Sequence, residues 1–146
     1  MIDDIADNLK HMDQGDTNVA IKVNIDQSKN FCSDRVGVSI VLNNLVSNAI
    51  RYRNPESNQP YVNIEVSATD DRANIVVKDN GIGISKELQG KIFDMFYRVS
   101  DETDGTGLGL FLVKETIEKL HGQIKVESEL GKGSVFRILI PNTNIV

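Results

Sequence analysis

The sequence predicts an α/β (α+β) two-layer sandwich, in which helices cover one face of a mixed, mainly antiparallel β-sheet. Alternating apolar and polar residues mark several short strands, and two pairs of them are separated only by polar or glycine-rich turns, which indicates hairpins. Other segments repeat apolar residues at three- and four-residue steps, which indicates amphipathic helices. The order strand, helix, hairpin, helix, helix, hairpin favours one sheet with its helices on a single face.

The chain is predicted to begin with a short helix that lies outside the main domain. One face of residues 2–12 carries the apolar side chains Ile2, Ile5, Leu9 and Met12. A helix of this length buries too little apolar surface to be stable alone, so we expect residues 1–16 to be the end of a preceding domain's last helix, with its linker. Residues 17–146 form the main domain, which opens with an alternating strand over residues 19–25.

The longest predicted helix covers residues 34–52, which read DRVGVSIVLNNLVSNAIRY. Its apolar face combines Val38, Val41 or Leu42, Leu45, Ala49 and Tyr52. Asn44 and Asn48 lie four residues apart on a neighbouring stripe, with Arg51 one turn further along. Asparagine is unfavourable inside a helix because its side chain competes for the backbone, and amides beside an apolar face are costly unless polar groups meet them. Asn44 and Asn48 are therefore exposed to solvent, hydrogen-bonded within the core, or part of a ligand site.

The remaining elements follow from the same two periodicities and from turn and cap residues. Predicted strands cover residues 61–68, 73–79, 123–128 and 134–140. Predicted helices cover residues 85–92 and 108–120. The expected caps are Ser33 or Asp34 for the central helix, Ser85 for the next, and the pair His121–Gly122 at the end of the last.

Composition restricts the class of protein. The 146 residues are 40% hydrophobic and 25% charged, which is typical of one globular domain with a core. A net charge of −5 and the lack of a basic patch argue against nucleic acid as a partner. Cys32 is the single cysteine, so no internal disulfide can form. Since no apolar run approaches the roughly 20 residues of a membrane span and the acidic start is no signal peptide, we expect a cytoplasmic chain, which could still belong to a membrane-anchored parent.

Two glycine-rich motifs indicate a ligand site. Asp79 ends a predicted strand and opens the motif DNGIG, in which Gly81 and Gly83 allow the backbone to turn and approach a ligand closely. A carboxylate there can accept from an exocyclic amine such as that of adenine, although a plain turn explains this motif alone about as well. The motif GTGLGL at residues 105–110 precedes a helix, whose free N–H groups and dipole favour phosphate. It matches neither the dinucleotide-binding pattern nor a Walker loop.

These features occur together and in a characteristic order. From the N- to the C-terminus the chain carries NNLVSNAIRY, VKDNGIGIS, IFDMFYR, GTGLGLFLVKE and GKGSVF. The combination resembles the ATP-binding catalytic domain (HATPase_c) of bacterial two-component sensor histidine kinases, within the GHKL superfamily, over about residues 17–141. The resemblance implies the Bergerat α/β sandwich, which agrees with the element order, and it implies ATP and Mg²⁺ as cofactors.

The resemblance assigns the polar residues of the central helix to the phosphate end of a nucleotide. Asn48 would coordinate Mg²⁺, Asn44 would lie beside the phosphates, and Arg51 would contact them. Tyr52 would border the pocket, and Asp79 would receive the adenine amino group directly and through water. The physical chemistry fits, because Mg²⁺ prefers oxygen ligands and keeps several waters. Phosphoryl transfer also needs positioning and charge neutralisation more than covalent chemistry by the protein.

The same resemblance places a mobile lid over ATP, between the phenylalanine box and the second glycine motif. Phe93 and Phe96 would anchor one end of the lid. Residues 99–106 carry three acidic side chains and almost nothing to bury, so we expect them to be mobile without nucleotide. Arg98 could reach phosphate or be a solvated loop charge, and Ser134 would lie near adenine. The further residues implied at the site are Gly81, Gly83, Ile84, Gly105, Thr106, Gly107, Leu108 and Gly109.

A histidine kinase also needs an acceptor histidine, and neither histidine of this chain fits. His11 is followed by Met12 and Asp13, whereas family acceptors are followed by an acidic residue and then an arginine. His121 suits a helix C-terminus, where a cation is favourable. We therefore expect the chain to donate the γ-phosphoryl group of Mg-ATP to a histidine on a separate dimerisation and phosphoacceptor domain, which passes it to a response regulator. We expect this chain to be monomeric and its parent to be a homodimer.

Two other functions stay open at the level of sequence. One is a different GHKL protein kinase, such as an anti-sigma serine kinase or a mitochondrial-type dehydrogenase kinase, although the complete phenylalanine box and short lid favour the histidine kinases. The other is a non-catalytic nucleotide-binding scaffold, which the intact Asn48 and Asp79 disfavour. Ile40 stands one turn before Asn44, where some GHKL enzymes carry a glutamate base, so we expect any proton acceptor to come from the partner domain.

Overall fold

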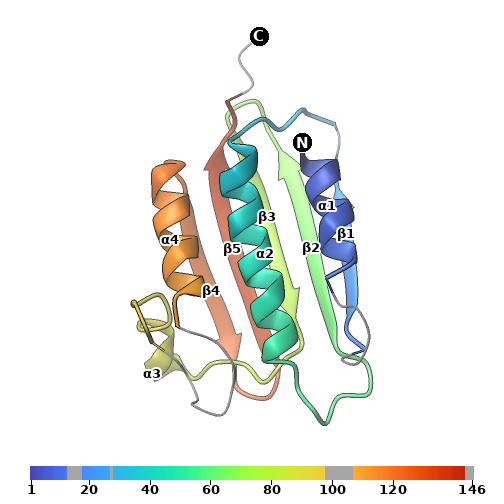
Figure 1. Cartoon of the computed structure of the whole chain (residues 1–146), viewed down its shortest axis with the longest axis vertical. Helices are drawn as coiled ribbons and strands as arrows, with labels where there is room; N and C mark the ends of the chain where they lie inside the picture. The colour runs from blue at the N-terminus through green and yellow to red at the C-terminus, as the bar shows by residue number, and fades with distance from the viewer. Residues whose placement is uncertain (13–17, 27, 98–106, 144–146) are drawn as a thin grey trace.

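One five-stranded sheet with helices on a single face makes up the part of the chain that the computed structural model describes, residues 1–12, 18–26, 28–97 and 107–143 (Figure 1). In sheet order the strands are β1 (Ala20–Ile25), β2 (Tyr61–Ala68), β3 (Arg72–Asp79), β5 (Gly133–Pro141) and β4 (Gln123–Glu129). The helices are α1 (Ile2–Lys10), α2 (Arg35–Arg51), α3 (Lys86–Gln89) and α4 (Gly109–Lys119). This arrangement confirms the predicted two-layer class.

The sheet is mixed because β1 pairs with β2 in parallel, whereas the other neighbouring strands are antiparallel. Helix α2 connects the two parallel strands, since such strands need a long crossover. The pairs β2–β3 and β4–β5 are the two predicted hairpins. β3 then pairs with β5, which is distant in sequence, and this register places Asp79 opposite Ser134. The pairing therefore brings the first glycine motif next to the start of the last strand.

Helix α2 lies over the middle of the sheet and buries its apolar face against it (Figure 1). Its residues that are at most 1% exposed are Val38, Val41, Leu42, Leu45 and Val46. They belong to the same hydrophobic cluster as inward-facing residues of β2 and β3 such as Ile64 and Ile75. Each large aliphatic side chain buried in this way stabilises the fold by roughly 1.5–3 kcal/mol. The predicted apolar face is confirmed, and α4 packs alongside α2 at its other edge.

Helix α1 shares this core. Ile5 and Leu9 are 2% and 0% exposed, and the helix packs against β1 and α2. It ends at Lys10, before the predicted end at Met12. The assignment of residues 1–16 to the end of a preceding domain stays a prediction. None of the described helices is long and apolar enough to span a membrane.

One short segment differs from the prediction. The helix expected over residues 85–92 is a single turn, Lys86–Gln89, and Ser85 makes no side-chain cap bond. Gly90 follows this turn, and glycine is a poor helix former. The Gln89 amide instead bonds to the Ile84 and Ser128 carbonyls, at 2.9 Å each. The bond to Ser128 in β4 joins residues 39 apart in the chain, so local sequence patterns do not reveal it.

The cap of α2 provides a test of the helix start. The Asp34 side chain accepts a hydrogen bond from the backbone N–H of Val36 at 3.0 Å. Asp34→Ala removes this acceptor and should lower the free energy of unfolding by about 1 kcal/mol, as measured by urea denaturation. Asp34→Ser keeps a capping oxygen and is the matched control. If the alanine variant were as stable as the wild type, the cap would contribute nothing.

Candidate functional site

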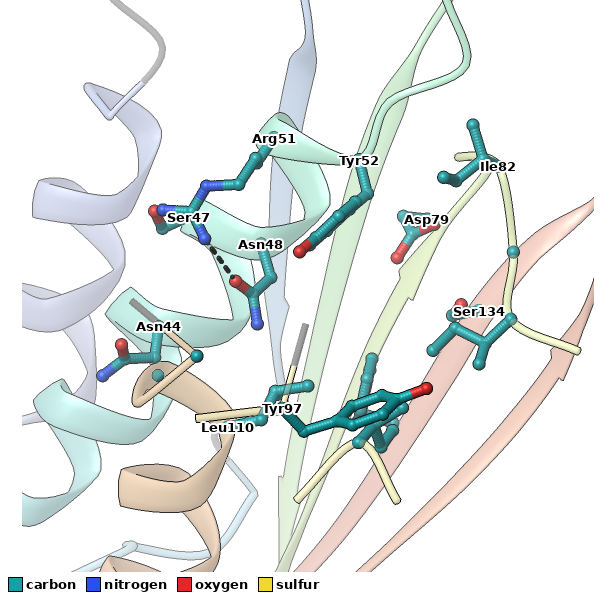
Figure 2. Close-up of a pocket in the computed structure, with 16 residues that line it drawn as sticks. Asn44, Ser47, Asn48, Arg51, Tyr52, Asp79, Ile82, Tyr97, Leu110 and Ser134 are labelled. Carbon is teal, nitrogen blue, oxygen red and sulfur yellow. Dashed lines mark hydrogen bonds between the residues drawn. The ribbon is translucent and has the colours of Figure 1, made fainter. Parts of the chain in front are cut away.

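A cavity of about 300 Å³ lies between α2, the start of α4 and the adjacent ends of β3 and β5 (Figure 2). Polar groups line it on the α2 and β3 sides. Apolar residues complete its walls. The lining residues are Asn44, Ser47, Asn48, Arg51, Tyr52, Asp79, Ile82, Gly83, Ile84, Ile92, Tyr97, Gly107, Gly109, Leu110, Ser134 and Phe136.

The polar stripe of α2 forms one wall of the cavity. Arg51 Nη1 donates a hydrogen bond to Asn48 Oδ1 at 3.0 Å (Figure 2). Asn44 Nδ2 donates to the Ile40 carbonyl of its own helix at 2.7 Å. The Asn44 oxygen lies close to the N-terminus of α4, because a Cβ atom added to Gly109 would be 3.2 Å from Asn44 Oδ1. The stripe thus places amide groups and a cation beside the start of another helix.

Asp79 forms the opposite end of the cavity. Gly81 N–H donates to Asp79 Oδ1 at 2.9 Å, and the Ser134 N–H also bonds to this carboxyl group. Burial raises the pKa of Asp79 above its ordinary value of 3.8, and the two N–H groups offset part of that increase. The ionised form of this carboxyl group is thus partly desolvated, and a ligand group that donates hydrogen bonds would stabilise it.

The glycines after β3 let their loop lie against two other parts of the chain. Gly83 has a φ of +75°, and a Cβ atom there would be 2.0 Å from the Glu129 carbonyl oxygen in β4. A Cβ atom on Gly81 would be 2.6 Å from the carbonyl oxygen of Tyr52, which accepts a hydrogen bond from Ile82 N–H at 3.0 Å. These close approaches explain why glycine is required at both positions.

Phe96, which the sequence predicts to anchor one end of the lid together with Phe93, contacts Gly107. Phe96 N–H donates to the Gly107 carbonyl at 3.0 Å, and both residues have positive φ angles. Phe96 is 65% exposed, whereas Phe93 is half-buried and packs edge-to-face on Phe136, with ring centroids 6.5 Å apart. The lid over residues 99–106 lies outside the described residues. So do three of the predicted site residues, Arg98, Gly105 and Thr106.

Most of the described residues that the sequence assigned to the site do line the cavity. They are Asn44, Asn48, Arg51, Tyr52, Asp79, Gly83, Ile84, Gly107, Gly109 and Ser134. Gly81, Phe96 and Leu108 do not line it, although Gly81 bonds to Asp79 and Phe96 bonds to Gly107. Roles in binding remain predictions for all of these residues.

Six lining residues were not predicted, namely Ser47, Ile82, Ile92, Tyr97, Leu110 and Phe136. Ser47 could have been found, because it lies one turn from both Asn44 and Arg51 on the predicted helix. Tyr97 belongs to the phenylalanine box. The other four are apolar, and their side chains are indistinguishable from core residues until the cavity is known.

A metal ion at this site would depend on amide oxygens. The described part of the chain holds no group of three or more His, Cys, Asp or Glu side chains that could bind a metal. Asn48 lines the cavity, and its Oδ1 accepts a hydrogen bond from Arg51 at 3.0 Å; oxygens of a ligand and of water could complete a shell around an ion there. Mg²⁺ accepts such a set, because it is often bound through few protein oxygens and several waters.

Comparison with known sequences gives consistent matches. Residues 33–144 match the sequence model of a family described as histidine kinase-, DNA gyrase B- and HSP90-like ATPases. Sensor histidine kinase RppB of Synechocystis is 38% identical over 134 residues, which cover 84% of this chain and 29% of RppB. Sensor protein SrrB of Staphylococcus aureus is 35% identical over 143 residues, covering 91% of this chain and 23% of SrrB. The chain thus spans less than a third of the length of these relatives.

Solved structures share the fold. The nucleotide-free catalytic domain of histidine kinase ThkA matches with a TM-score of 0.77 and 26% identity, over 97% of this chain and 94% of that one. The mycobacterial sensor histidine kinase MprB gives a TM-score of 0.79 at 21% identity, with the same coverage of both chains. Full-length ShkA in complex with AMPPNP gives 0.79 at 24% identity, over 99% of this chain and 30% of ShkA. The GHKL-like fold is therefore confirmed.

Two glycine substitutions test the position of the loop after β3. Gly83 and Gly131 have φ angles of +75° and +82°, where a residue with a side chain costs about 1–2 kcal/mol. A Cβ atom on Gly83 would also overlap Glu129, whereas no described atom lies within 4 Å of one on Gly131. Gly83→Ala should therefore lower the unfolding temperature more than Gly131→Ala. Equal losses would show that the loop does not lie against β4.

The pKa of Asp79 predicts a dependence of stability on pH. Because this pKa is raised in the folded state, the Asp79 carboxyl is more protonated in the folded than in the unfolded chain at pH values between its unfolded and folded pKa. The contribution of Asp79 to stability should therefore fall as the pH rises through the folded pKa. Asp79→Asn has no charge to bury, so its unfolding temperature should exceed that of the wild type at pH 7. The difference between the two unfolding temperatures should shrink as the pH falls towards 3.8. Thermal melts between pH 3.8 and pH 7 measure this difference, and a difference that did not depend on pH would contradict the prediction.

Proposed function

Since this chain belongs to the family of histidine kinase-, DNA gyrase B- and HSP90-like ATPases, as a domain of the histidine kinase type, we propose that it binds Mg-ATP and donates the γ-phosphoryl group to a histidine on a separate domain. One observation carries the proposal. A single cavity joins an acceptor-rich end at Asp79 to an end with the amides and cation of Asn48 and Arg51. The base and the phosphates of an adenine nucleotide are complementary to these two ends.

The base would bind at the Asp79 end. The Asp79 carboxylate is partly buried and is held by the N–H groups of Gly81 and Ser134. It can accept a hydrogen bond from an exocyclic amine, and this bond is worth more where water is excluded. Ile82, Ile84 and Phe136 supply apolar surface for the ring faces of the base.

The phosphates would bind at the α2 end. Arg51 supplies positive charge in a chain whose net charge is −5, so attraction of a polyanion depends on such local groups. Gly109 begins α4, an eleven-residue helix, and N–H groups at a helix start favour anions. Asn48, with Arg51 hydrogen-bonded to it, would hold Mg²⁺ against the phosphate oxygens. Bound Mg²⁺ would neutralise charge that develops in phosphoryl transfer.

The cavity supports transfer to a protein acceptor better than hydrolysis. Among the described lining residues Asp79 is the sole carboxylate, and it lies at the base end. Ile40 occupies the position one turn before Asn44, so α2 offers no base to activate water there. A histidine of a phosphoacceptor domain would bring its own nucleophilic nitrogen. The isolated chain should therefore bind ATP but hydrolyse it slowly.

The proposal also names the partners. The acceptor would be the dimerisation and phosphoacceptor domain of a homodimeric parent kinase, and a response regulator would take the phosphoryl group from it. Both expectations agree with the sensor kinases among the relatives, of which this chain spans only part. Phosphoryl transfer of this kind would take place in the cytoplasm.

Transfer to a matching phosphoacceptor domain tests the proposal. With γ-labelled ATP and Mg²⁺, label should appear on that domain as an acid-labile, base-stable phosphate, which is typical of phosphohistidine. Asn48→Ala should reduce Mg²⁺-dependent ATP binding by about 10–100-fold, because the loss of groups that hold a metal has costs of this size. Asn74→Ala, on the exposed side of β3, is the matched control and should behave as the wild type.

Three outcomes would contradict parts of this proposal. Acid-stable label would indicate a serine kinase instead. ATP binding without any label on the acceptor would indicate a nucleotide-binding scaffold. Equal Mg²⁺-dependent stabilisation of the wild type and Asn48→Ala by ATP, in a thermal-shift assay, would exclude Asn48 as the metal ligand; saturating ligand at a hundred times its dissociation constant contributes roughly 2.7 kcal/mol.

A further inference from the structure

The Ser128 hydroxyl lies behind the base end of the cavity and contacts three groups that build it. Ser128 is in β4, directly opposite Ser134 in the strand register. Its Oγ accepts a hydrogen bond from Ile84 N–H at 2.7 Å, donates to the Gly133 carbonyl at 2.8 Å, and lies 2.7 Å from Ser134 Oγ. Ile84 and Ser134 line the cavity, whereas Ser128 does not. Any role of Ser128 at the site is therefore indirect.

Counting protons assigns the direction of the bond between the two serines. A hydroxyl has one proton to donate and two lone pairs to accept with. Since the proton of Ser128 goes to the Gly133 carbonyl, the proton between the two serines must come from Ser134. Ser128 Oγ is then complete, with one bond donated and two accepted. Ser134 Oγ has used its proton, and only its lone pairs remain for a group in the cavity.

Gln89 also holds the two residues Ile84 and Ser128 in place. Its Nε2 donates to the carbonyl of Ile84 and to the carbonyl of Ser128, at 2.9 Å each. Ile84 is thus bound through its N–H by Ser128 and through its carbonyl by Gln89. Neither Gln89 nor Ser128 lines the cavity, but together they tie the loop after β3 to β4.

The base end of the cavity therefore offers acceptors in two adjacent positions. Asp79 presents a carboxylate, and Ser134, its partner across the β3–β5 pair, presents hydroxyl lone pairs. An exocyclic amino group has two N–H bonds to donate and matches both positions. A carbonyl oxygen at the same place on a base would meet only acceptors, which leaves its lone pairs unsatisfied and repelled.

We propose that Ser128 and Gln89 are positioning residues that hold the Ser134 hydroxyl as an acceptor, and that the site thereby selects a base with an exocyclic amino group over one with a carbonyl. This inference rests on the proposed binding of an adenine nucleotide. It adds the selection device, which consists of residues outside the cavity.

The test compares the affinities of the chain for Mg-ATP and Mg-ITP, whose base carries a carbonyl oxygen where adenine carries its amino group. Ser128→Ala frees the Ser134 proton, so that this hydroxyl can turn and donate to a carbonyl. The preference for ATP over ITP should fall by roughly three- to tenfold, the range for one neutral hydrogen bond. Ser128→Thr keeps the hydroxyl and should restore the preference.

Further variants separate selection from folding. Ser67→Ala, on an exposed position of β2, is the matched control and should leave the preference unchanged. Gln89→Met removes the amide without touching a hydroxyl, so it should shift the preference in the same direction as Ser128→Ala but less, even if Ser128→Ala proved too unstable to assay. Thermal melts of each variant without ligand check that the fold is intact.

The outcomes also separate this inference from the proposed function. If the wild type bound neither ATP nor ITP, the proposed function would fail. If it bound both equally, or if folded Ser128→Ala kept the full preference for ATP, the positioning role would be wrong while nucleotide binding stood. A loss of affinity for both nucleotides by the same factor would likewise overturn selection, since it would indicate a structural role alone.

Discussion

The packing of α2 on the sheet is the contact on which the rest of the structure depends. Its apolar face is almost completely buried, with Val38, Leu42 and Leu45 at most 1% exposed. That burial fixes the rotation of the helix about its axis, because turning it would expose these side chains to water. The neighbouring stripe with Asn48 is consequently held beside the start of α4, at the cavity near the ends of β3 and β5. The burial that stabilises the domain thus also places the side-chain amides of Asn44 and Asn48 at the cavity.

The two ends of the cavity differ in what they can hydrogen-bond. The β3–β5 end presents oxygen acceptors from Asp79 and Ser134, whereas the α2 end presents a guanidinium group and the start of a helix. Partial burial of Asp79 costs free energy, since none of the described residues forms an ion pair with it. Such a cost is tolerated where a ligand can later supply donors. The site is therefore polarised along its length, as the adenine and triphosphate ends of one nucleotide require.

Much of the fold was predictable because its signals are local. Alternation marks each strand to within about one residue, and the spacing of apolar residues marks α2 and α4. The exceptions are informative. The segment after Ser85 is a single helical turn that ends at Gly90, and Gln89 bonds to Ser128, 39 residues away. Lining residues such as Ile92 and Phe136 were missed for a similar reason, since an apolar side chain beside a cavity looks the same in sequence as one in the core.

The sequence by itself determined the element order, the apolar face of α2, and the polar and glycine motifs that resemble a kinase nucleotide site, since each depends on neighbours within a few residues. The tertiary structure alone decided which of these motifs meet. Pairing of β3 with β5 sets Asp79 opposite Ser134, and pairing of β4 with β5 sets Ser128 behind them. Register and hydroxyl direction depend on contacts between distant strands, and spacing along one chain carries no record of such contacts.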